Sequence, residues 1–267
     1  DEVTLSKTKE YGLISEYNKL EKRRCRPFNQ IREEDKKLIK EGIDEQGRAL
    51  AVREKAWYRF LDEMLAKNQK ETFDRVPEIY SFEPFVMEKI DGKNIFEYED
   101  LSKEEKRKKN EKIVSMLKEL HALGSVPTDH YSMKEAYYTK TRQRLLSIRD
   151  LIPFADRKTI VVNGRECRNV FYYMEELEEK IKSLKAADFS FLHGDCTFSN
   201  LMLKKGTEPV MIDPRGYFGF TEMYGDAAYD WAKLYYSIVG NYDRFNRKEF
   251  RLTIGENEVG LEIESNH

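Results

Sequence analysis

The sequence predicts an α+β protein in which short strands precede long amphipathic helices. Short apolar runs at residues 36–42, 76–80 and 85–92 are typical of strands. Apolar residues recur at helical spacing over residues 101–123 and 169–185. The chain of 267 residues is long enough for one large domain or two small ones.

The first strand and the helix after it each carry a charged candidate. In residues 36–42, two apolar residues come directly before Lys40, as in a strand that delivers a lysine into a cleft. The lysines at 36–37 are the alternatives. A helix is expected from about residue 50 to 65, with Glu54 in its first turn and an apolar stripe of Val52, Trp57, Phe60, Leu61 and Met64. Because 36% of the residues are charged, either candidate can instead be an ordinary solvated charge.

The middle elements are mostly architectural. Pro84 separates the strands at 76–80 and 85–92, and the second strand is expected to pack in the core. The helix that follows begins with a capping box, in which Ser102 accepts the backbone N–H of Glu105. This helix and the one expected at 169–185 present apolar stripes and carry no chemistry of their own.

The residues most informative about chemistry lie at 191–200 and 210–213. Asp195 is followed by Asn200 after five residues and by Asp213 after a further thirteen. Two short apolar strands joined by a turn are expected to bring Asn200 and Asp213 to one end of a ribbon. A carboxylate can accept the proton of an attacking hydroxyl, and amide and carboxylate oxygens suit Mg²⁺, so the pattern indicates phosphoryl transfer. The alternative is a surface hairpin whose polar residues only cap turns.

The motif His-Gly-Asp, whose aspartate is Asp195, followed by Asn200 and then by Ile-Asp at Asp213, resembles the aminoglycoside phosphotransferase and choline kinase group. The resemblance implies a bilobal protein-kinase-like fold with a small β-rich N-terminal lobe and a larger, mainly helical C-terminal lobe. It also implies that Asp195 is the catalytic base, that Asn200 and Asp213 hold Mg²⁺, and that ATP is the phosphate donor.

The same resemblance divides the chain and assigns its nucleotide contacts. It implies a nucleotide-binding lobe at residues 1–90, a hinge near 87–92, and a catalytic and substrate lobe at 91–267. An ion pair between Lys40 and Glu54 would position the lysine on the triphosphate. In the hinge, the backbone N–H and C=O groups of residues Glu88, Lys89 and Ile90 would contact the adenine ring. The alternative is a central strand that only packs in the core, and the same strand can also do both.

Two departures separate the chain from protein kinases. No Gly-rich loop precedes Lys40, and residues 23–30 contain no glycine. The basic cluster at 22–26 can contact phosphates or form a solvated strand edge. Gly194 stands where most protein kinases have an arginine that reads a phosphorylated activation loop, which implies activity without such a switch. A protein kinase and a catalytically silent kinase-fold binding module remain the alternatives from other classes.

The acceptor side carries a narrower resemblance. Residues 212–219 and 224–234 are similar to kinase modules of bacterial surface-polysaccharide biosynthesis. This likeness implies a hydroxyl of a sugar or sugar derivative as the acceptor. The alternative is an amino alcohol such as choline or ethanolamine, which aromatic rings hold by cation–π attraction.

Three residues in this region are singled out. Arg215 can grip a phosphate or carboxylate group, which favours a neutral or anionic acceptor, or it can form a salt bridge with Asp226 or Glu222. Trp231 is the aromatic candidate for acceptor contact, although most aromatic residues nearby are expected in the core. Asp230 resembles the buried aspartate that braces the catalytic loop in this fold.

Composition limits the remaining possibilities. With 47 basic and 49 acidic residues, the charge balance gives no indication of a nucleic-acid or membrane partner. Cys25, Cys167 and Cys196 form no C-x-x-C pair, which favours the reduced thiols of a cytoplasmic protein. Alternation at residues 250–263 predicts a terminal β-hairpin. Because the chain starts at Asp1 and closes on that hairpin, we expect one domain of a larger polypeptide.

Overall fold

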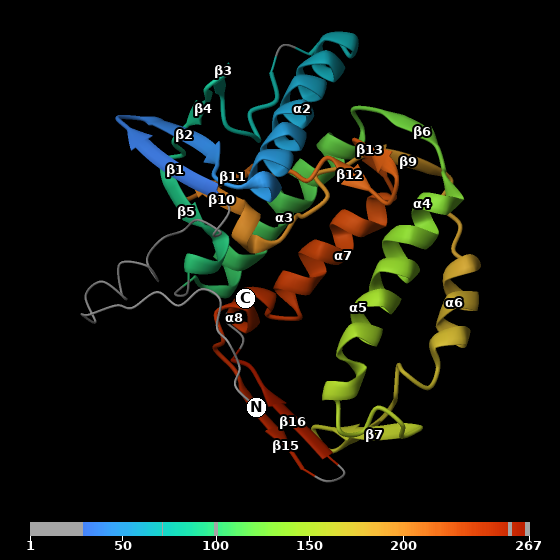
Figure 1. Cartoon of the computed structure of the whole chain (residues 1–267). Helices are drawn as coiled ribbons and strands as arrows, with labels where there is room; N and C mark the ends of the chain where they lie inside the picture. The colour runs from blue at the N-terminus through green and yellow to red at the C-terminus, as the bar shows by residue number, and fades with distance from the viewer. Residues whose placement is uncertain (1–28, 71, 99–100, 256–257, 265–267) are drawn as a thin grey trace.

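The N-terminal lobe is a twisted antiparallel sheet with one long helix against it. A computed structural model describes residues 29–70, 72–98, 101–255 and 258–264. The sheet has the strand order β1-β2-β4-β3 (Figure 1), with bounds β1 Asn29–Glu34, β2 Lys37–Gly42, β3 Ile79–Phe82 and β4 Phe85–Glu88. The predicted strands are present with shifted bounds, since β3 begins at Ile79 rather than at 76 and β4 ends at Glu88 rather than at 92. Lys40 pairs in register with Ile31 and Phe85.

Helix α2 (Glu45–Lys67) starts about five residues earlier than the sequence indicated. Asp44 is its N-cap and accepts the Gly47 N–H at 2.6 Å, so a cap that satisfies an otherwise unpaired donor decides where the helix begins. The predicted first-turn position of Glu54 is therefore wrong, because Glu54 lies in the middle of the helix. Val52 does not belong to the buried stripe, since 64% of it is exposed.

The larger lobe is mainly helical. The capping box predicted at Ser102 is present, and it opens the helix that runs through the centre of the lobe. The helix predicted at 169–185 is shorter than expected, because α6 covers only Met174–Lys182. The helices are α3 Lys103–His121, α4 His130–Lys134, α5 Lys140–Ile148, α6 Met174–Lys182, α7 Ala227–Ile238 and α8 Tyr242–Asn246.

Short strands hold the functional loops between these helices. The order β11-β10-β5 builds the predicted ribbon onto the strand that follows the N-terminal sheet, and β14-β9-β6 carries the loop that contains Asp195. The bounds are β5 Gly92–Asn94, β6 Ser125–Pro127, β9 Asp188–Phe191, β10 Leu201–Lys204, β11 Glu208–Met211, β12 Tyr217–Phe218, β13 Thr221–Glu222 and β14 Tyr224–Gly225.

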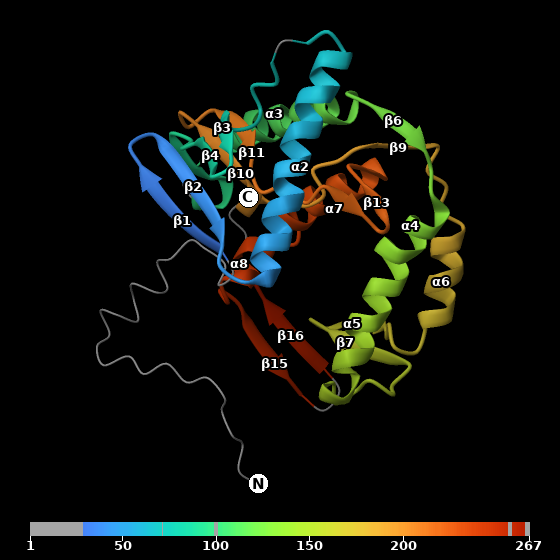
Figure 2. The same cartoon turned by 45° about the horizontal axis from the view of Figure 1, so that its top comes forward.

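The predicted terminal hairpin, β15 (Arg251–Ile254) and β16 (Glu258–Glu262), is confirmed. It does not stand alone, because β16 runs parallel to β7 (Thr159–Val162), which in turn pairs with β8 (Arg165–Arg168). Figures 1 and 2 both show this sheet beyond the end of α5. The β7–β8 hairpin was not predicted, although its turn is Asn-Gly at positive φ, a strong hairpin signal.

One core joins the two lobes. Trp57 of α2 is fully buried, stacks on Phe191 with ring centroids 5.0 Å apart, and donates its indole N–H to the Leu192 carbonyl at 2.7 Å. The helix of the N-terminal lobe is thereby fixed directly to the loop that contains Asp195. Across the described residues, we find no helix with the length and apolarity that crossing a membrane requires.

Candidate active site

The predicted ribbon brings Asn200 and Asp213 together. Asn200 directly precedes β10 and Asp213 follows β11, and the two strands are in register with Leu201 opposite Met211. The Ile212 N–H donates to the Asn200 carbonyl at 3.0 Å, which extends the pairing to the end of the ribbon. The Asn200 amide nitrogen then donates to the Asp195 carbonyl at 2.9 Å. All three predicted polar residues therefore meet at one end of this ribbon.

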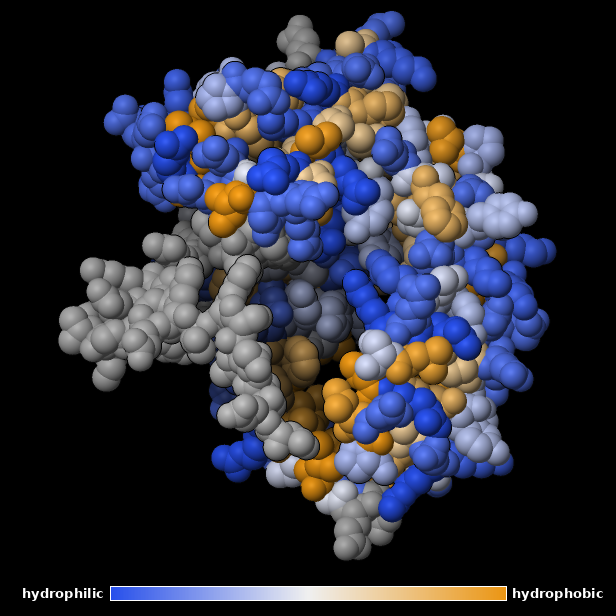
Figure 3. All heavy atoms as spheres, in the orientation of Figure 1, coloured by the Kyte–Doolittle hydropathy of each residue, from blue (hydrophilic) through white to orange (hydrophobic). Residues whose placement is uncertain are grey.

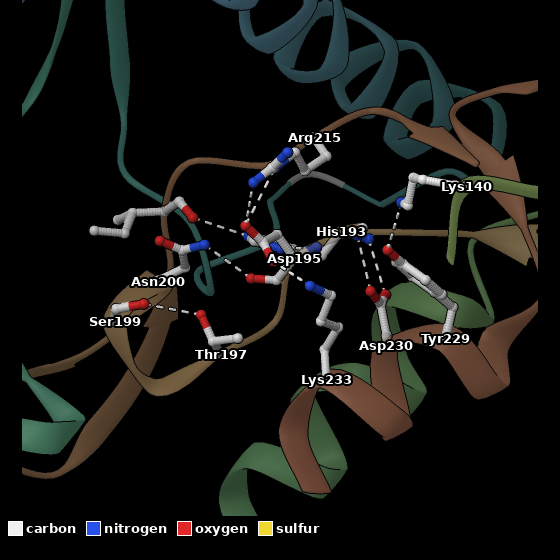
Figure 4. A network of polar contacts seen from close by, with 12 residues as sticks. Lys140, His193, Asp195, Thr197, Ser199, Asn200, Arg215, Tyr229, Asp230 and Lys233 are labelled. Carbon is white, nitrogen blue, oxygen red and sulfur yellow. Dashed lines mark hydrogen bonds and ion pairs between the residues drawn. The ribbon is translucent and has the colours of Figure 1, made fainter. Parts of the chain in front are cut away.

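Two cations flank the carboxylate of Asp195 (Figure 4). Arg215 approaches Oδ2 through Nε at 3.1 Å and Nη2 at 2.9 Å, and Lys233 reaches Oδ1 at 3.1 Å. Burial alone would raise the pKa of Asp195, but attraction to Arg215 and Lys233 outweighs it and holds the pKa below its usual value. The carboxylate is therefore ionised at neutral pH and ready to accept a hydrogen bond.

The partner of Arg215 differs from both predicted salt bridges. Asp226 instead caps α7 by accepting the Ala228 N–H at 3.0 Å, and it also accepts the Tyr137 hydroxyl. The sequence could not show that the turn after Asp213 folds back onto Asp195. The Arg215 N–H donates to the His193 carbonyl at 2.8 Å, and this contact fixes that turn.

Asp230 braces the loop that contains Asp195, as the resemblance implied. Its fully buried carboxylate accepts the His193 N–H at 2.9 Å and the Gly194 N–H at 2.8 Å, and His121 lies 3.1 Å from it. Gly194 has φ +83°, and a Cβ there would lie 2.9 Å from the Arg215 Cβ. A glycine is thus required both by the backbone and by the close approach of Arg215.

We expect Asp230→Asn to lower the free energy of unfolding by about 1–2 kcal/mol, because an amide can accept only one of the two buried N–H groups. Urea unfolding followed by circular dichroism measures the change. The matched control is Asp44→Asn at the N-cap of α2, where asparagine caps as well as aspartate and the stability should stay within a few tenths of a kcal/mol. Equal stability of Asp230→Asn and wild type would show that the brace contributes little.

Lys40 and Glu54 form the predicted ion pair. Their Nζ and Oε2 atoms are 2.6 Å apart and both side chains are buried, and Lys40 also contacts Asp213. Burial opposes the charge on Lys40, but Asp213 and Glu54 outweigh it and raise the lysine pKa. Burial raises the pKa of Glu54 to about 7 despite the opposing attraction of Lys40. The lysine thus connects the helix of the N-terminal lobe to the end of the ribbon.

The residues predicted to form the hinge are already partly engaged in hydrogen bonds and ion pairs. The Glu88 N–H donates to Glu78 and the Lys89 N–H donates to Lys36, both at 2.8 Å. Their side chains pair with Lys204 and Glu33. Within the described ranges, the Ile90 N–H has no hydrogen-bond acceptor, so Ile90 alone of the three predicted residues has its backbone donor available. The basic cluster at 22–26 lies outside the described residues.

Asn200 and Asp213 also fit a hard divalent cation. The Asn200 amide nitrogen is committed to Asp195, which leaves its Oδ1 as an oxygen donor. The Asp213 side chain is 53% exposed, so one carboxylate and one amide oxygen flank the same space at the end of the ribbon. These are the ligand types that Mg²⁺ prefers, with water and phosphate oxygens completing its shell.

A cavity of about 870 Å³ opens in front of Asp195, lined by α5, α7 and the loops between. In Figure 3 a hollow is visible at this place, with apolar side chains along its lower rim. Trp231 does not line the cavity, because it packs against the core and meets the His121 ring edge-on at 5.5 Å. Lys233 was missed, although its position three residues after Asp230 on a helix places it on a neighbouring face.

Comparison with known proteins places the chain in a family. The model of the phosphotransferase enzyme family, APH, matches residues 32–256. No curated protein matches the chain. A solved streptomycin–ATP–APH(2")-IIa ternary complex is similar at 19% identity and a TM-score of 0.44, covering 84% of this chain and 75% of that one. A gentamicin–APH(2")-IIa complex shows 20% identity and a TM-score of 0.43 over the same shares.

Proposed function

The chain belongs to the phosphotransferase enzyme family, a group of ATP-dependent small-molecule kinases, and we propose that it phosphorylates a hydroxyl of a sugar or sugar derivative. One observation carries the proposal: Asp195 lines a large cavity, and its main-chain carbonyl accepts the amide of Asn200, which lies at the same end of the ribbon as Asp213. A small acceptor in the cavity and a nucleotide at the ribbon end would meet at the carboxylate of Asp195.

In the proposed reaction the acceptor oxygen attacks the γ-phosphorus of ATP. A new O–P bond forms, the bond from the γ-phosphorus to the β–γ bridging oxygen breaks, and ADP leaves with its electron pair. Asp195 accepts the hydroxyl proton, while Lys40, held by Glu54, contacts the phosphates. A magnesium ion held by Asn200 and Asp213 would neutralise phosphate charge. Arg215 and Lys233 stand where they can face the transferring phosphoryl group.

We also propose that the lobes divide near residue 90. Residues 89–91 connect β4 of the N-terminal sheet to β5, which belongs to the ribbon sheet of the other lobe. A nucleotide-binding lobe at 1–90 and a catalytic lobe at 91–267, with a hinge at 87–92, agree with this connection. The adenine ring would then take a hydrogen bond from the Ile90 N–H.

An acceptor panel tests the function directly. Sugars, sugar derivatives, choline, ethanolamine and a generic peptide are each supplied with Mg-ATP, and acceptor-dependent ADP release is recorded. Phosphorylation of a sugar supports the proposal. Phosphorylation of choline alone, or of peptide alone, contradicts it in favour of the corresponding alternative. Failure of the protein to bind Mg-ATP would favour a silent binding module.

Asp213→Ala is expected to weaken Mg-ATP binding by about tenfold or more, because the metal loses its anionic ligand. Isothermal titration calorimetry with and without Mg²⁺ measures the effect, which should disappear when the metal is omitted. Asp188→Ala, at an exposed position at the start of β9, is the control. Unchanged Mg-ATP affinity in Asp213→Ala would remove this residue from the metal site.

A further inference from the structure

The acceptor cavity is strongly positive. We propose, resting on the function above, that the acceptor carries an anionic group, a carboxylate or a phosphate, and that Lys140 and Arg144 bind it. Both residues lie on α5, four positions apart, and both line the cavity in front of Asp195. At this spacing they occupy neighbouring positions on one face of the helix, about one turn apart.

The charges that line the cavity are unbalanced. Among the described residues, four cations face it, Lys140, Arg144, Arg215 and Lys233, against the single carboxylate of Asp195. Arg215 and Lys233 already share that carboxylate. Lys140 and Arg144 therefore contribute positive charge that no acidic residue of the lining offsets.

Neither cation on α5 has a charged partner within the described ranges. The Lys140 Nζ donates to the Tyr229 hydroxyl at 3.5 Å, and among the described residues the Arg144 guanidinium forms no hydrogen bond or ion pair. Basic residues close by behave differently, since Arg149 pairs with Asp156. A lysine and an arginine that line a cavity without counter-ions are typical of a site whose counter-ion is the ligand.

The placement also suits the reaction. The ring of Tyr229 is close both to Lys140 on α5 and to Lys233 on α7, whose Nζ atoms lie 5.8 Å and 5.7 Å from its centroid (Figure 4). Lys233 in turn contacts Asp195. A sugar ring against Tyr229 would thus present a hydroxyl toward Asp195 at one end and its anionic group toward α5 at the other. The cavity volume of about 870 Å³ accommodates a ligand of that length.

A positively charged acceptor fits this cavity poorly. The Tyr229 ring could hold an ammonium group by cation–π attraction, but Lys140 and Lys233 already lie 5.8 Å and 5.7 Å from its centroid, so a further cation there would meet two like charges. Asp195 is the only carboxylate that the described part of the chain contributes to the cavity lining, and it has two cations already. Choline and amino sugars are therefore disfavoured by the same residues that favour an anion.

The test uses acceptors that share the galactose ring and differ in one charged substituent: galactose, galacturonate, galactose 1-phosphate and galactosamine. For the wild-type protein we expect kcat/KM for at least one anionic member to exceed that for galactose by about tenfold or more, the scale of a hydrogen-bonded charge pair. Galactosamine should be the poorest acceptor. Preference for galacturonate or for galactose 1-phosphate distinguishes a carboxylate ligand from a phosphate ligand.

Variants locate the site. Arg144→Gln and Lys140→Gln should each reduce the ratio of anionic to neutral kcat/KM by about tenfold, mainly through the acceptor KM. Arg142→Gln removes the same charge from the same helix outside the cavity, and its ratio should equal that of wild type. A ratio unchanged in both cavity variants, or an equal or greater preference for galactose or galactosamine in wild type, overturns the inference.

Calorimetric binding without ATP separates this inference from the proposed function. If an anionic probe binds and Arg144→Gln weakens that binding, the anion site is supported, whether or not phosphoryl transfer follows. If the probe binds but no transfer follows, only the kinase proposal is contradicted. Failure of both anionic probes to bind overturns the anion site. Efficient transfer to galactose would still leave the kinase function standing in that case.

Discussion

Asp195→Asn is expected to lower kcat by about 10²-fold or more while leaving ATP affinity nearly unchanged. The amide keeps the size of the carboxylate and its oxygen can still accept from Arg215 or from Lys233, but it cannot take the proton of the acceptor hydroxyl. Removing one negative charge between two cations should not repel the nucleotide. Steady-state ADP release gives kcat, and calorimetry gives the ATP affinity.

The control for this substitution is Asp188→Asn, the same chemical change at an exposed position at the start of β9. Its turnover should match wild type. Similar turnover of Asp195→Asn and wild type would show that Asp195 is not the base. A large loss of ATP affinity in Asp195→Asn would instead point to a general disturbance of the loop.

Lys40→Met is expected to abolish most turnover and to lower the free energy of unfolding at pH 8 by about 3 kcal/mol or more. The structure places Glu54 in a buried position where its Oε1 has no hydrogen-bond partner, so Oε2 depends on Lys40. Without the lysine, an unpaired carboxylate remains buried. Urea unfolding at several pH values measures the loss.

The loss in Lys40→Met should shrink as the pH falls. Burial already raises the pKa of Glu54 to about 7, above its ordinary value of 4.5, and loss of Lys40 raises it further. A carboxyl group whose pKa is higher in the folded state binds its proton more tightly there, so protonation stabilises the fold as the pH falls through that pKa toward 4.5. The difference between Lys40→Met and wild type should therefore be smaller at pH 5.5 than at pH 8.

A second variant separates stability from catalysis. Lys40→Met combined with Glu54→Gln removes the buried charge and should recover most of the lost stability, but not the turnover. If the double variant regained turnover as well, Lys40 would have only a structural role. If Lys40→Met were as stable as wild type at pH 8, the buried pair would not be needed for the fold.

The sequence predicted those parts of the site that depend on local structure alone. The ribbon that joins Asn200 to Asp213 follows from apolar runs and a turn, and the brace at Asp230 follows from a motif, so neither needs long-range information. The conformation of the turn after Asp213 depends on tertiary contacts. For that reason the predicted salt bridge of Arg215 with Asp226 or Glu222 was wrong.

Other differences have separate causes. The start of α2 was set by Asp44, a cap that stands before residues without a clear apolar period. The basic pair at Lys140 and Arg144 carries no motif, and its meaning emerges only when α5 is placed opposite Asp195. Trp231 resembled a ligand-binding aromatic in sequence, but packing against the core decides its position.

The contact between Trp57 and Leu192 has a consequence for control of the enzyme. In kinases that are switched by moving the helix with the glutamate, that helix swings away and separates the lysine from its partner. Here such a swing would pull a fully buried indole off Phe191 and break its hydrogen bond to the loop of Asp195. Such a swing would thus cost the burial of Trp57 and its hydrogen bond to Leu192, and these contacts hold the helix in the position that pairs Glu54 with Lys40.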